Sequence, residues 1–310
     1  MVSRVLVIAL NTYREAVRAR LLLGVFALAL ATCLYAMVVA SLSLHNEVRV
    51  VADLGAAAVS LYGVLIAVVL GSTSLYRELE HKTVFPILSR PIRRWEYLLG
   101  KYLGTMLTVV VFVATDTAAV LGTLALEAGQ TTAKVALPFG AMLALLGIAL
   151  VRARHVRVFV MIPWSFVLAA VVWTAAAPAL EDRQLVVAAA LLSICEVAIV
   201  AAVATLFASF SSPFLTATFT AMVFIIGRSS DTLAHLPKKM FGESVALAFA
   251  GLARVVPNLH VYVPPRPLLL GQVASQAVWR YVGMAAAHAF FYATALLVIG
   301  ALAFRKRDFS

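Results

Sequence analysis

The chain has 310 residues, of which 63% are hydrophobic and only 13% are charged, and its formal net charge is +11. A soluble globular domain carries about 25% charged residues, so this chain has too few polar side chains to cover a surface in water, and a soluble single-core protein is excluded. The positive charge does not indicate a nucleic-acid partner, because Lys and Arg collect in the cytoplasmic loops of membrane proteins.

Residues 3–20 precede the first long apolar run and predict a helix of their own. Four polar side chains recur at spacings of seven, four and three residues, which places them on one stripe of a helix: Arg4, Asn11, Glu15 and Arg18. We expect this helix to lie in the inner membrane interface, with its arginines at anionic lipid headgroups. The alternative is that residues 3–20 simply extend the first membrane span.

Long apolar runs predict an all-α, polytopic membrane protein with a single transmembrane domain over residues 1–310. A membrane-spanning helix needs about 20 apolar residues. Eight runs are candidates: 21–43, 54–75, 102–126, 135–151, 158–179, 185–208, 213–229 and 278–303. The fourth and seventh runs are short. A six-span alternative keeps 135–179 out of the count, as a re-entrant hairpin.

The Lys and Arg residues predict the orientation of these spans. With the N-terminus inside, 16 of the 25 Lys and Arg fall in inner segments, and the three short outer loops hold only Arg49, Lys134 and Arg183. Basic residues favour the cytoplasmic side, so both termini are expected there, in the cytoplasmic membrane. The basic loop "RARHVR" (152–157) also belongs inside, which favours eight spans over six.

The segment 76–101 is a long charged stretch between the second and third runs. Thr83 can cap a short helix, and Pro91 suits the first position of the helix that follows. Spacing of i, i+3 and i+4 puts Val84, Ile87 and Leu88 on one apolar face, which would meet water unless a soluble partner covers it. The alternative is an ordinary basic loop with an interfacial helix.

A pair of glycines lies at the inner end of the third run. Gly100 and Gly104 form a small-xxx-small pattern, which lets two helices approach closely. We expect a helix-packing role for them.

Acidic residues stand inside two of the apolar runs: Asp116 and Glu196. Each costs about 2.5–3.5 kcal/mol near the centre of a membrane helix on insertion scales, so such residues usually face the interior of the bundle. They are candidates for the wall of a translocation path or an ion site. The alternative is packing through interhelical hydrogen bonds, with Thr115 or Thr117 helping Asp116.

The long outer segment, residues 230–277, contains two short apolar stretches at 244–256 and 267–278. Neither is long enough to span a membrane, so we expect helices that dip into the outer leaflet.

Motifs for catalysis or cofactor binding are missing from the sequence. It contains no phosphate-binding GxxxxGK[ST], no HExxH and no GxSxG, and no Cys and His residues have metal-ligand spacing. We therefore expect neither an enzyme nor a metal or cofactor site in this chain.

The stretch 78–104 resembles the cytoplasmic coupling segment of ATP-binding cassette (ABC) transporter permeases of the ABC-2 type. That segment has acidic residues, a Thr, a Leu-Ser-x-Pro turn, a basic cluster and "LLGK.LG". "NTYREAVRARLL" (11–22) resembles the family's N-terminal elbow helix, and 205–227 and 255–262 resemble its penultimate hairpin and outer segment. The chain departs from the family at Phe85-Pro86 and in the extra pair of runs at 135–179.

This resemblance implies a permease subunit, of the kind that usually exports its substrate, with ATP and Mg bound by a separate ABC ATPase subunit. It also implies a second permease copy or homologue, which forms a homo- or heterodimer. The residues expected to couple to the ATPase are Glu78, Glu80, Thr83, Val84, Ile87, Leu88, Ser89, Pro91 and Arg93. Rival functions are an ion-coupled secondary transporter and a structural membrane anchor for a partner complex.

Overall fold

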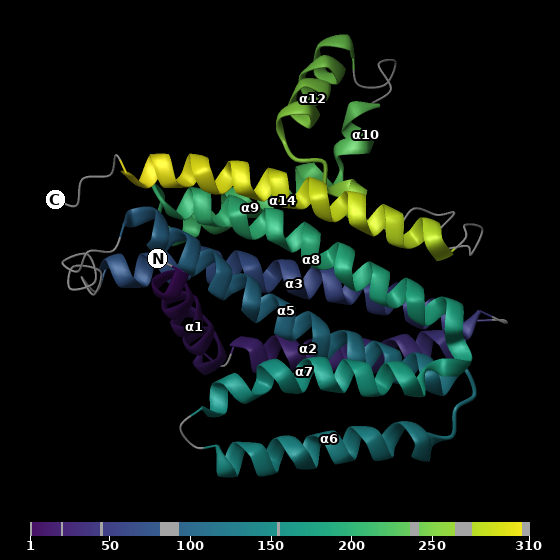
Figure 1. Cartoon of the computed structure of the whole chain (residues 1–310). Coiled ribbons are helices and arrows are strands. Elements are labelled where there is room, and N and C mark those ends of the chain that lie inside the picture. The colour runs from purple at the N-terminus through teal and green to yellow at the C-terminus, as the bar shows by residue number, and fades with distance from the viewer. Residues whose placement is uncertain are drawn as a thin grey trace.

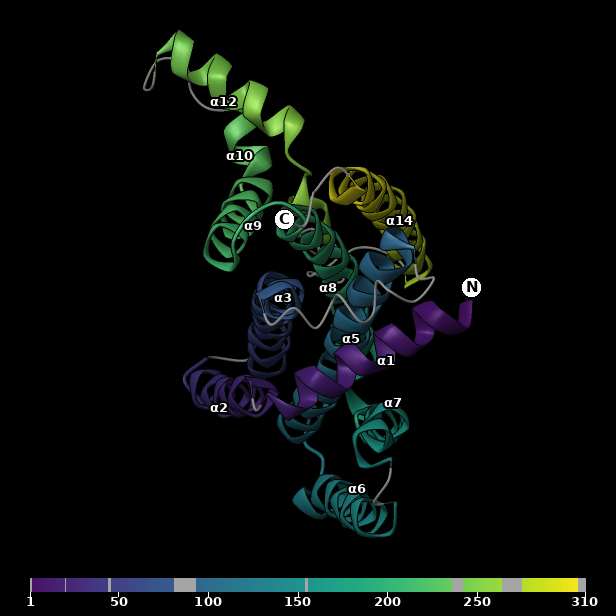
Figure 2. The ribbon, with the colours of Figure 1, turned by 90° about the vertical axis from the view of Figure 1, so that its left-hand side faces the viewer.

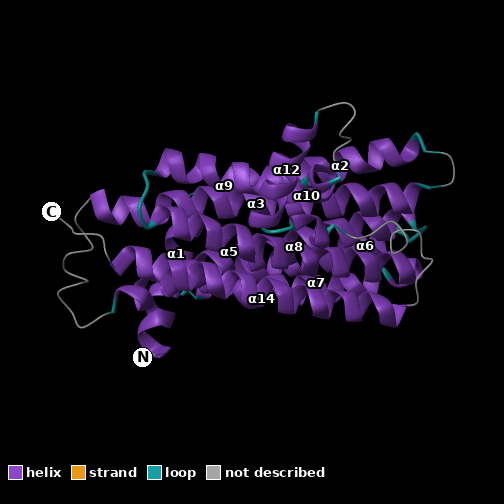
Figure 3. Ribbon diagram, turned by 90° about the horizontal axis from the view of Figure 1, so that it is seen from above, coloured by secondary structure: helices purple, strands orange, loops and turns teal. Residues whose placement is uncertain are grey.

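The computed structural model describes residues 2–19, 21–43, 46–80, 93–153, 156–235, 242–263 and 275–305. Helices make up this part of the chain, joined by short connections, and these ranges contain no strand (Figure 3). The structure therefore confirms the predicted all-α class and, through its long apolar helices, a multi-pass membrane protein.

Seven helices form a bundle whose members run along a common direction (Figure 1). They are α2 (Leu21–Ser41), α3 (Glu47–Glu80), α5 (Arg94–Glu127), α6 (Thr132–Arg152), α7 (Arg157–Ala175), α8 (Leu180–Ala208) and α14 (Ser275–Arg305). The shorter elements are α1 (Val2–Arg18), η1 (Ala177–Ala179), α9 (Pro213–Arg228), α10 (Ser230–Ala234), α12 (Glu243–Val255) and η2 (Leu259–Tyr262).

All eight predicted apolar runs fall on helices, and seven described helices are long and apolar enough to cross a membrane. The exception is the run 213–229, which forms the 16-residue helix α9. At 1.5 Å per residue α9 is about 24 Å long, less than the hydrocarbon core of about 30 Å. Helices α6 and α7 are each of spanning length, so a re-entrant hairpin over 135–179 does not fit them.

The centre of the bundle is formed by α3, α5 and α8. In the apolar spans of α5 and α8, 72% of the residues are buried, against 11% in α6 at the edge. Small residues allow this close packing, because lipid offers no hydrophobic drive to bring helices together. A Cβ added to Gly71 of α3 would lie 2.6 Å from the Cβ of Ala204 on α8.

One end of the bundle, called here the basic end, gathers the helix termini that carry the predicted inner charges. It contains α1, the end of α3, the starts of α5 and α7 and the ends of α6 and α14, and it faces the viewer in Figure 2. The terminal residues of five of these helices are basic: Arg18, Arg94, Arg152, Arg157 and Arg305. This gathering agrees with the charge pattern, which placed these segments on one side.

Helix α1 is separate from α2 and crosses the basic end at a steep angle to the bundle (Figures 1 and 2). Its buried face is built from Val5, Ala9, Thr12, Tyr13 and Ala16, and the predicted polar stripe is exposed. The Tyr13 hydroxyl donates to the carbonyl of Val158 at 3.2 Å, and burial raises the pKa of Tyr13 to about 12. A continuous extension of the first span does not fit this arrangement.

Helix α9 starts at the basic end, finishes about halfway along the bundle, and continues into α10 and α12, which stand away from the other helices (Figures 1 and 2). The chain then returns, and η2 buries Leu259 and Tyr262 against α8 and α9. A Cβ at Gly227 would lie 2.6 Å from the carbonyl oxygen of Pro257, so the approach of this returning chain requires glycine there. The stretch 244–256 coincides closely with α12, and most of 267–278 lies outside the described residues.

Candidate functional site

Most of the predicted ATPase-coupling segment lies outside the described residues: Thr83, Val84, Ile87, Leu88, Ser89 and Pro91. Glu78 and Glu80 belong to the last turns of α3, where the structure describes the backbone. Arg93 is exposed directly before α5, and its backbone N–H donates to the Glu96 carboxylate at 3.0 Å. Glu96 is buried, so it fixes the first turn of α5.

The first turns of α5 are also tied to α14 and α8. The Arg94 guanidinium donates to the carbonyl of Phe304, near the end of α14, at 3.2 Å. Tyr97 and Leu98 form a buried cluster with Phe304 and with Ala208 of α8. A displacement of the α5 start would therefore reach two other membrane helices.

Gly100 and Gly104 lie directly under α1. A Cβ added to Gly100 would be 2.7 Å from the Ile8 side chain, and one added to Gly104 would be 2.5 Å from the backbone carbonyl oxygen of Ala9. Both distances are far below van der Waals contact. The two glycines thus bring α1 against α5.

Lys101 adds a polar tie between the same two helices. Its side chain is nearly fully buried, yet its Nζ is 3.4 Å from the Glu15 carboxylate on α1 and 5.9 Å from the Tyr97 ring centre. Asn11 orients Glu15 by donating to its other carboxylate oxygen at 2.8 Å. The buried ammonium consequently has an opposite charge beside it, as burial requires.

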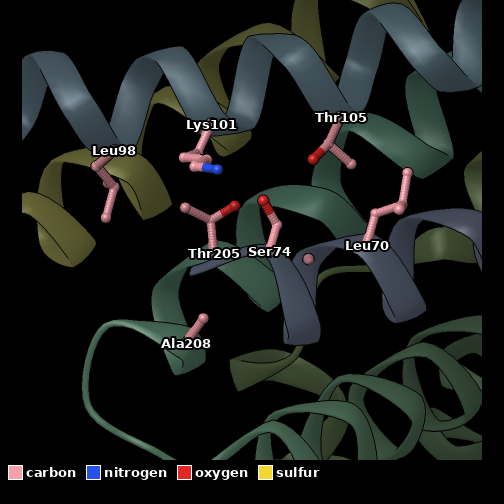
Figure 4. Close-up of a pocket in the computed structure, with 8 residues that line it drawn as sticks. Leu70, Ser74, Leu98, Lys101, Thr105, Thr205 and Ala208 are labelled. Atoms are coloured by element: carbon pink, nitrogen blue, oxygen red, sulfur yellow. The ribbon is translucent and has the colours of Figure 1, made fainter. Parts of the chain in front are cut away.

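A small cavity lies beside Lys101, between α3, α5 and α8 near the basic end (Figure 4). Its volume is about 10 Å³, which is room for about one water molecule. The Lys101 ammonium and three hydroxyl groups point into the same space, those of Ser74, Thr105 and Thr205. The Ser74 hydroxyl is buried and has no hydrogen-bond partner among the described residues, so the cavity can take a small polar group there.

Asp116 is fully buried in α5, where the described residues offer its carboxylate no hydrogen bond. Neither carboxylate oxygen has a hydrogen-bond partner in the described part of the chain, and the same holds for the hydroxyl of Thr117. The Thr115 hydroxyl donates to the carbonyl of Val111 instead, at 2.8 Å. The expected help from these threonines is therefore not found. An ionised carboxylate is very costly to bury without a partner, so we expect the neutral acid in this conformation.

Glu196 is also fully buried, in α8, but it is well paired. One carboxylate oxygen accepts from the Ser60 hydroxyl of α3 at 2.7 Å. The other forms an ion pair with the guanidinium of Arg228, the last residue of α9. This cluster joins three helices, and it differs from Asp116 in that each oxygen of its carboxylate is satisfied.

Ser60 and Arg228 were not predicted as partners of Glu196. A spanning helix over the predicted run 213–229 would put Arg228 at its outer end, whereas the short α9 places it beside a buried acid. The sequence did indicate that Glu196 needs a basic partner, because an acid inside an apolar run requires a compensating charge. Nothing local indicated which arginine supplies it, because the two residues are 32 positions apart.

A second polar contact joins η2 to α14. The Tyr262 hydroxyl and the Nδ1 atom of His288 are 2.8 Å apart, and the Tyr281 hydroxyl donates to the carbonyl of Val261. These bonds hold the returning chain after α12 against the bundle.

Among the described residues, no three His, Cys, Asp or Glu side chains gather as a metal site, and Cys33 and Cys195 are free thiols. No family model matches the sequence, and no curated protein matches it.

Proposed function

We propose that the chain is the membrane-spanning permease subunit of an ABC transporter of the ABC-2 type, an exporter in the cytoplasmic membrane. A separate ATPase subunit would bind ATP and Mg, so this chain would not itself be an enzyme. A second permease copy or homologue would complete the membrane part. In this proposal the basic end and both termini are cytoplasmic.

The observation that supports the proposal is the way in which the coupling segment is anchored. Its two flanking helices, α3 and α5, meet at the basic end and are both central in the bundle. Within the first three turns, α5 contacts α1 through Gly100 and Gly104 and binds α14 through Arg94. A force applied to residues 81–92 would therefore act on several helices.

Energy transfer requires that the ATPase bind the coupling segment differently in its two nucleotide states, because a partner with equal affinity for both would shift nothing. The apolar face of Val84, Ile87 and Leu88 would dock on the ATPase, and Glu78, Glu80 and Arg93 would orient it by charge. The cavity beside Lys101 lies where α3, α5 and α8 would shift against one another.

The second candidate function is an ion-coupled secondary transporter. Asp116 favours it, because a buried carboxylic acid without a hydrogen-bond partner among the described residues is a group that can carry a proton across the bundle. In that case transport would follow a proton gradient and would not need an ATPase.

The decisive experiment is co-purification of an ATPase with the tagged chain, followed by ATP hydrolysis in one reconstituted preparation. Ile87→Ala with Leu88→Ala should release the ATPase, because truncating packed Leu or Ile side chains costs about 2–5 kcal/mol. At about 1.4 kcal/mol per factor of ten, this is about a 30-fold or larger loss of affinity.

The matched control removes similar atoms from a lipid-facing position. Leu143→Ala with Leu145→Ala on the exposed side of α6 should leave the ATPase bound, because both residues are exposed at the edge of the bundle. Arg94 is unsuitable as a control, since it holds the end of α14. If the Ile87 and Leu88 variant still binds and activates the ATPase like the parent, the stretch is only a basic loop.

A further inference from the structure

The ion pair between Glu196 and Arg228 lies near the middle of the bundle. Ser60 is thirteen residues after the start of α3, and Glu196 is twelve residues before the end of α8. At 1.5 Å per residue these positions are about 18–20 Å from the helix ends. Arg228 ends α9 at the same level, since it contacts both residues.

The two members of the pair differ in exposure. The Glu196 side chain is 0% exposed, whereas the Arg228 side chain is 33% exposed. The guanidinium uses Nη1 for Glu196 and Ser60, and its remaining donors, on Nε and Nη2, form no hydrogen bond with described residues. The carboxylate is thus enclosed, and the open side of the pair presents only N–H donors and positive charge.

Such an arrangement does not suit contact with lipid chains. Unsatisfied donors and an exposed guanidinium are costly in hydrocarbon, so the open side of Arg228 needs water or an acceptor group. The end of α9 at mid-bundle supports this independently, because helix ends at membrane depth are tolerated only inside protein or beside a water-filled cavity.

We propose that the open side of Arg228 faces the translocation path and binds the negatively charged group of the transported solute, a carboxylate, phosphate or sulfate. This inference rests on the proposed function of a permease. Glu196 and Ser60 position the guanidinium through Nη1, and its free edge retains the planar donor geometry that fits oxyanions.

The nearest acid along the chain does not block this site. Asp231 lies on α10, and its carboxylate is 3.8 Å from Nδ1 of His235, the residue that follows this helix. Among the described residues, Asp231 forms no ion pair with Arg228. The guanidinium therefore remains available to a solute.

The test uses charged thiol reagents at the neighbouring position. Ser229→Cys is introduced with Cys33→Ala and Cys195→Ala, and the chain is reconstituted in liposomes. The reaction rates of anionic sulfonatoethyl methanethiosulfonate and cationic trimethylammonioethyl methanethiosulfonate are each divided by their rates with free 2-mercaptoethanol. We expect both reagents to react, with the anionic one favoured about fivefold, because the guanidinium is on the open side of the ion pair and the Glu196 carboxylate is enclosed behind it.

Paired substitutions assign that preference to Arg228. Arg228→Gln with Glu196→Gln removes both charges without leaving one buried alone, and should bring the ratio close to one. Arg228→Lys should retain the preference. Arg183→Gln is the charge-matched control, because Arg183 stacks on Trp173 at the far end of the bundle, and it should leave the ratio unchanged.

Each result decides the proposal. Reaction with neither reagent would place Ser229 in lipid or protein and overturn it. Reaction with both at equal normalised rates would show a water-filled path without anion preference, which also overturns it. A preference that depends on Arg228 in a chain that co-purifies no ATPase would uphold the anion site and contradict only the coupling to ATP.

Discussion

At the scale of single residues, the two acids inside the bundle have opposite environments although the sequence presents them alike. Glu196 has a hydroxyl and a guanidinium as partners, whereas both oxygens of Asp116 have none among the described residues. Breaking a buried ion pair is costly because the charge left behind is unpaired. Replacing a neutral acid by an amide removes no ionic contact.

This contrast predicts the stability of two isosteric variants. Glu196→Gln should lower the free energy of unfolding by about 3 kcal/mol or more, because Arg228 loses its partner. Asp116→Asn should change it by less than about 1 kcal/mol and should instead alter transport or ATP hydrolysis. Equilibrium unfolding in mixed detergent micelles measures the first effect, and activity in the same preparation measures the second.

The double variant Glu196→Gln with Arg228→Gln is the control for the ionic part, and should recover some of the lost stability. Equal losses for Glu196→Gln and Asp116→Asn would show that Asp116 has a partner in the assembled protein.

At the scale of elements, the position of α1 depends on the two glycines of α5. Both lie against α1 so closely that a methyl group would overlap it, and at Gly104 the nearest atom belongs to the backbone of α1. Backbone cannot rotate away as a flexible side chain can, so α1 would have to shift. Helix α1 can therefore pack across the start of α5 only because Gly100 and Gly104 have no side chain.

Gly104→Ala should therefore loosen α1 and destabilise the protein by about 1–3 kcal/mol, the usual cost of overpacking. Limited proteolysis at α1, together with unfolding in detergent, measures this. Gly140→Ala on α6 is the matched control, because nothing lies within 4 Å of its added Cβ. It should be neutral or slightly stabilising, since Ala is the better helix former. Equal behaviour of the two variants would contradict the close packing of α1.

At the scale of the whole molecule, the helix ends that carry basic residues gather at one end of the bundle. Charged loops cross a membrane with difficulty, so this end is expected in the cytoplasm. Helices α6 and α7 are each of spanning length, which brings their connection to the same end as the start of α5.

Cysteine labelling of intact cells tests this orientation. In a chain with Cys33→Ala and Cys195→Ala, Ala153→Cys should resist an impermeant thiol reagent until the cells are opened. Thr131→Cys, at the opposite end of α6, should react from outside and serves as the control. Labelling of the cysteine at position 153 from outside would reverse the topology or remove two spans.

The sequence by itself determined the class of protein, the helical runs and the amphipathic character of α1. These properties are local, because an apolar run in lipid must satisfy its own backbone as a helix, and a polar stripe is set by residue spacing. The small-xxx-small pattern likewise indicated close packing, but not that α1 is the helix packed on Gly100 and Gly104.

Only the tertiary structure decided how the polar groups pair. The partners of Glu196 are 136 and 32 residues away in sequence, and Arg228 reaches it because α9 ends halfway along the bundle. Likewise, the carboxylate of Asp116 has no hydrogen-bond partner among the described residues because of the helix faces that are turned toward it. Pairing of this kind is set by helix rotation and by which helices are neighbours, and neither is contained in a local pattern of residues.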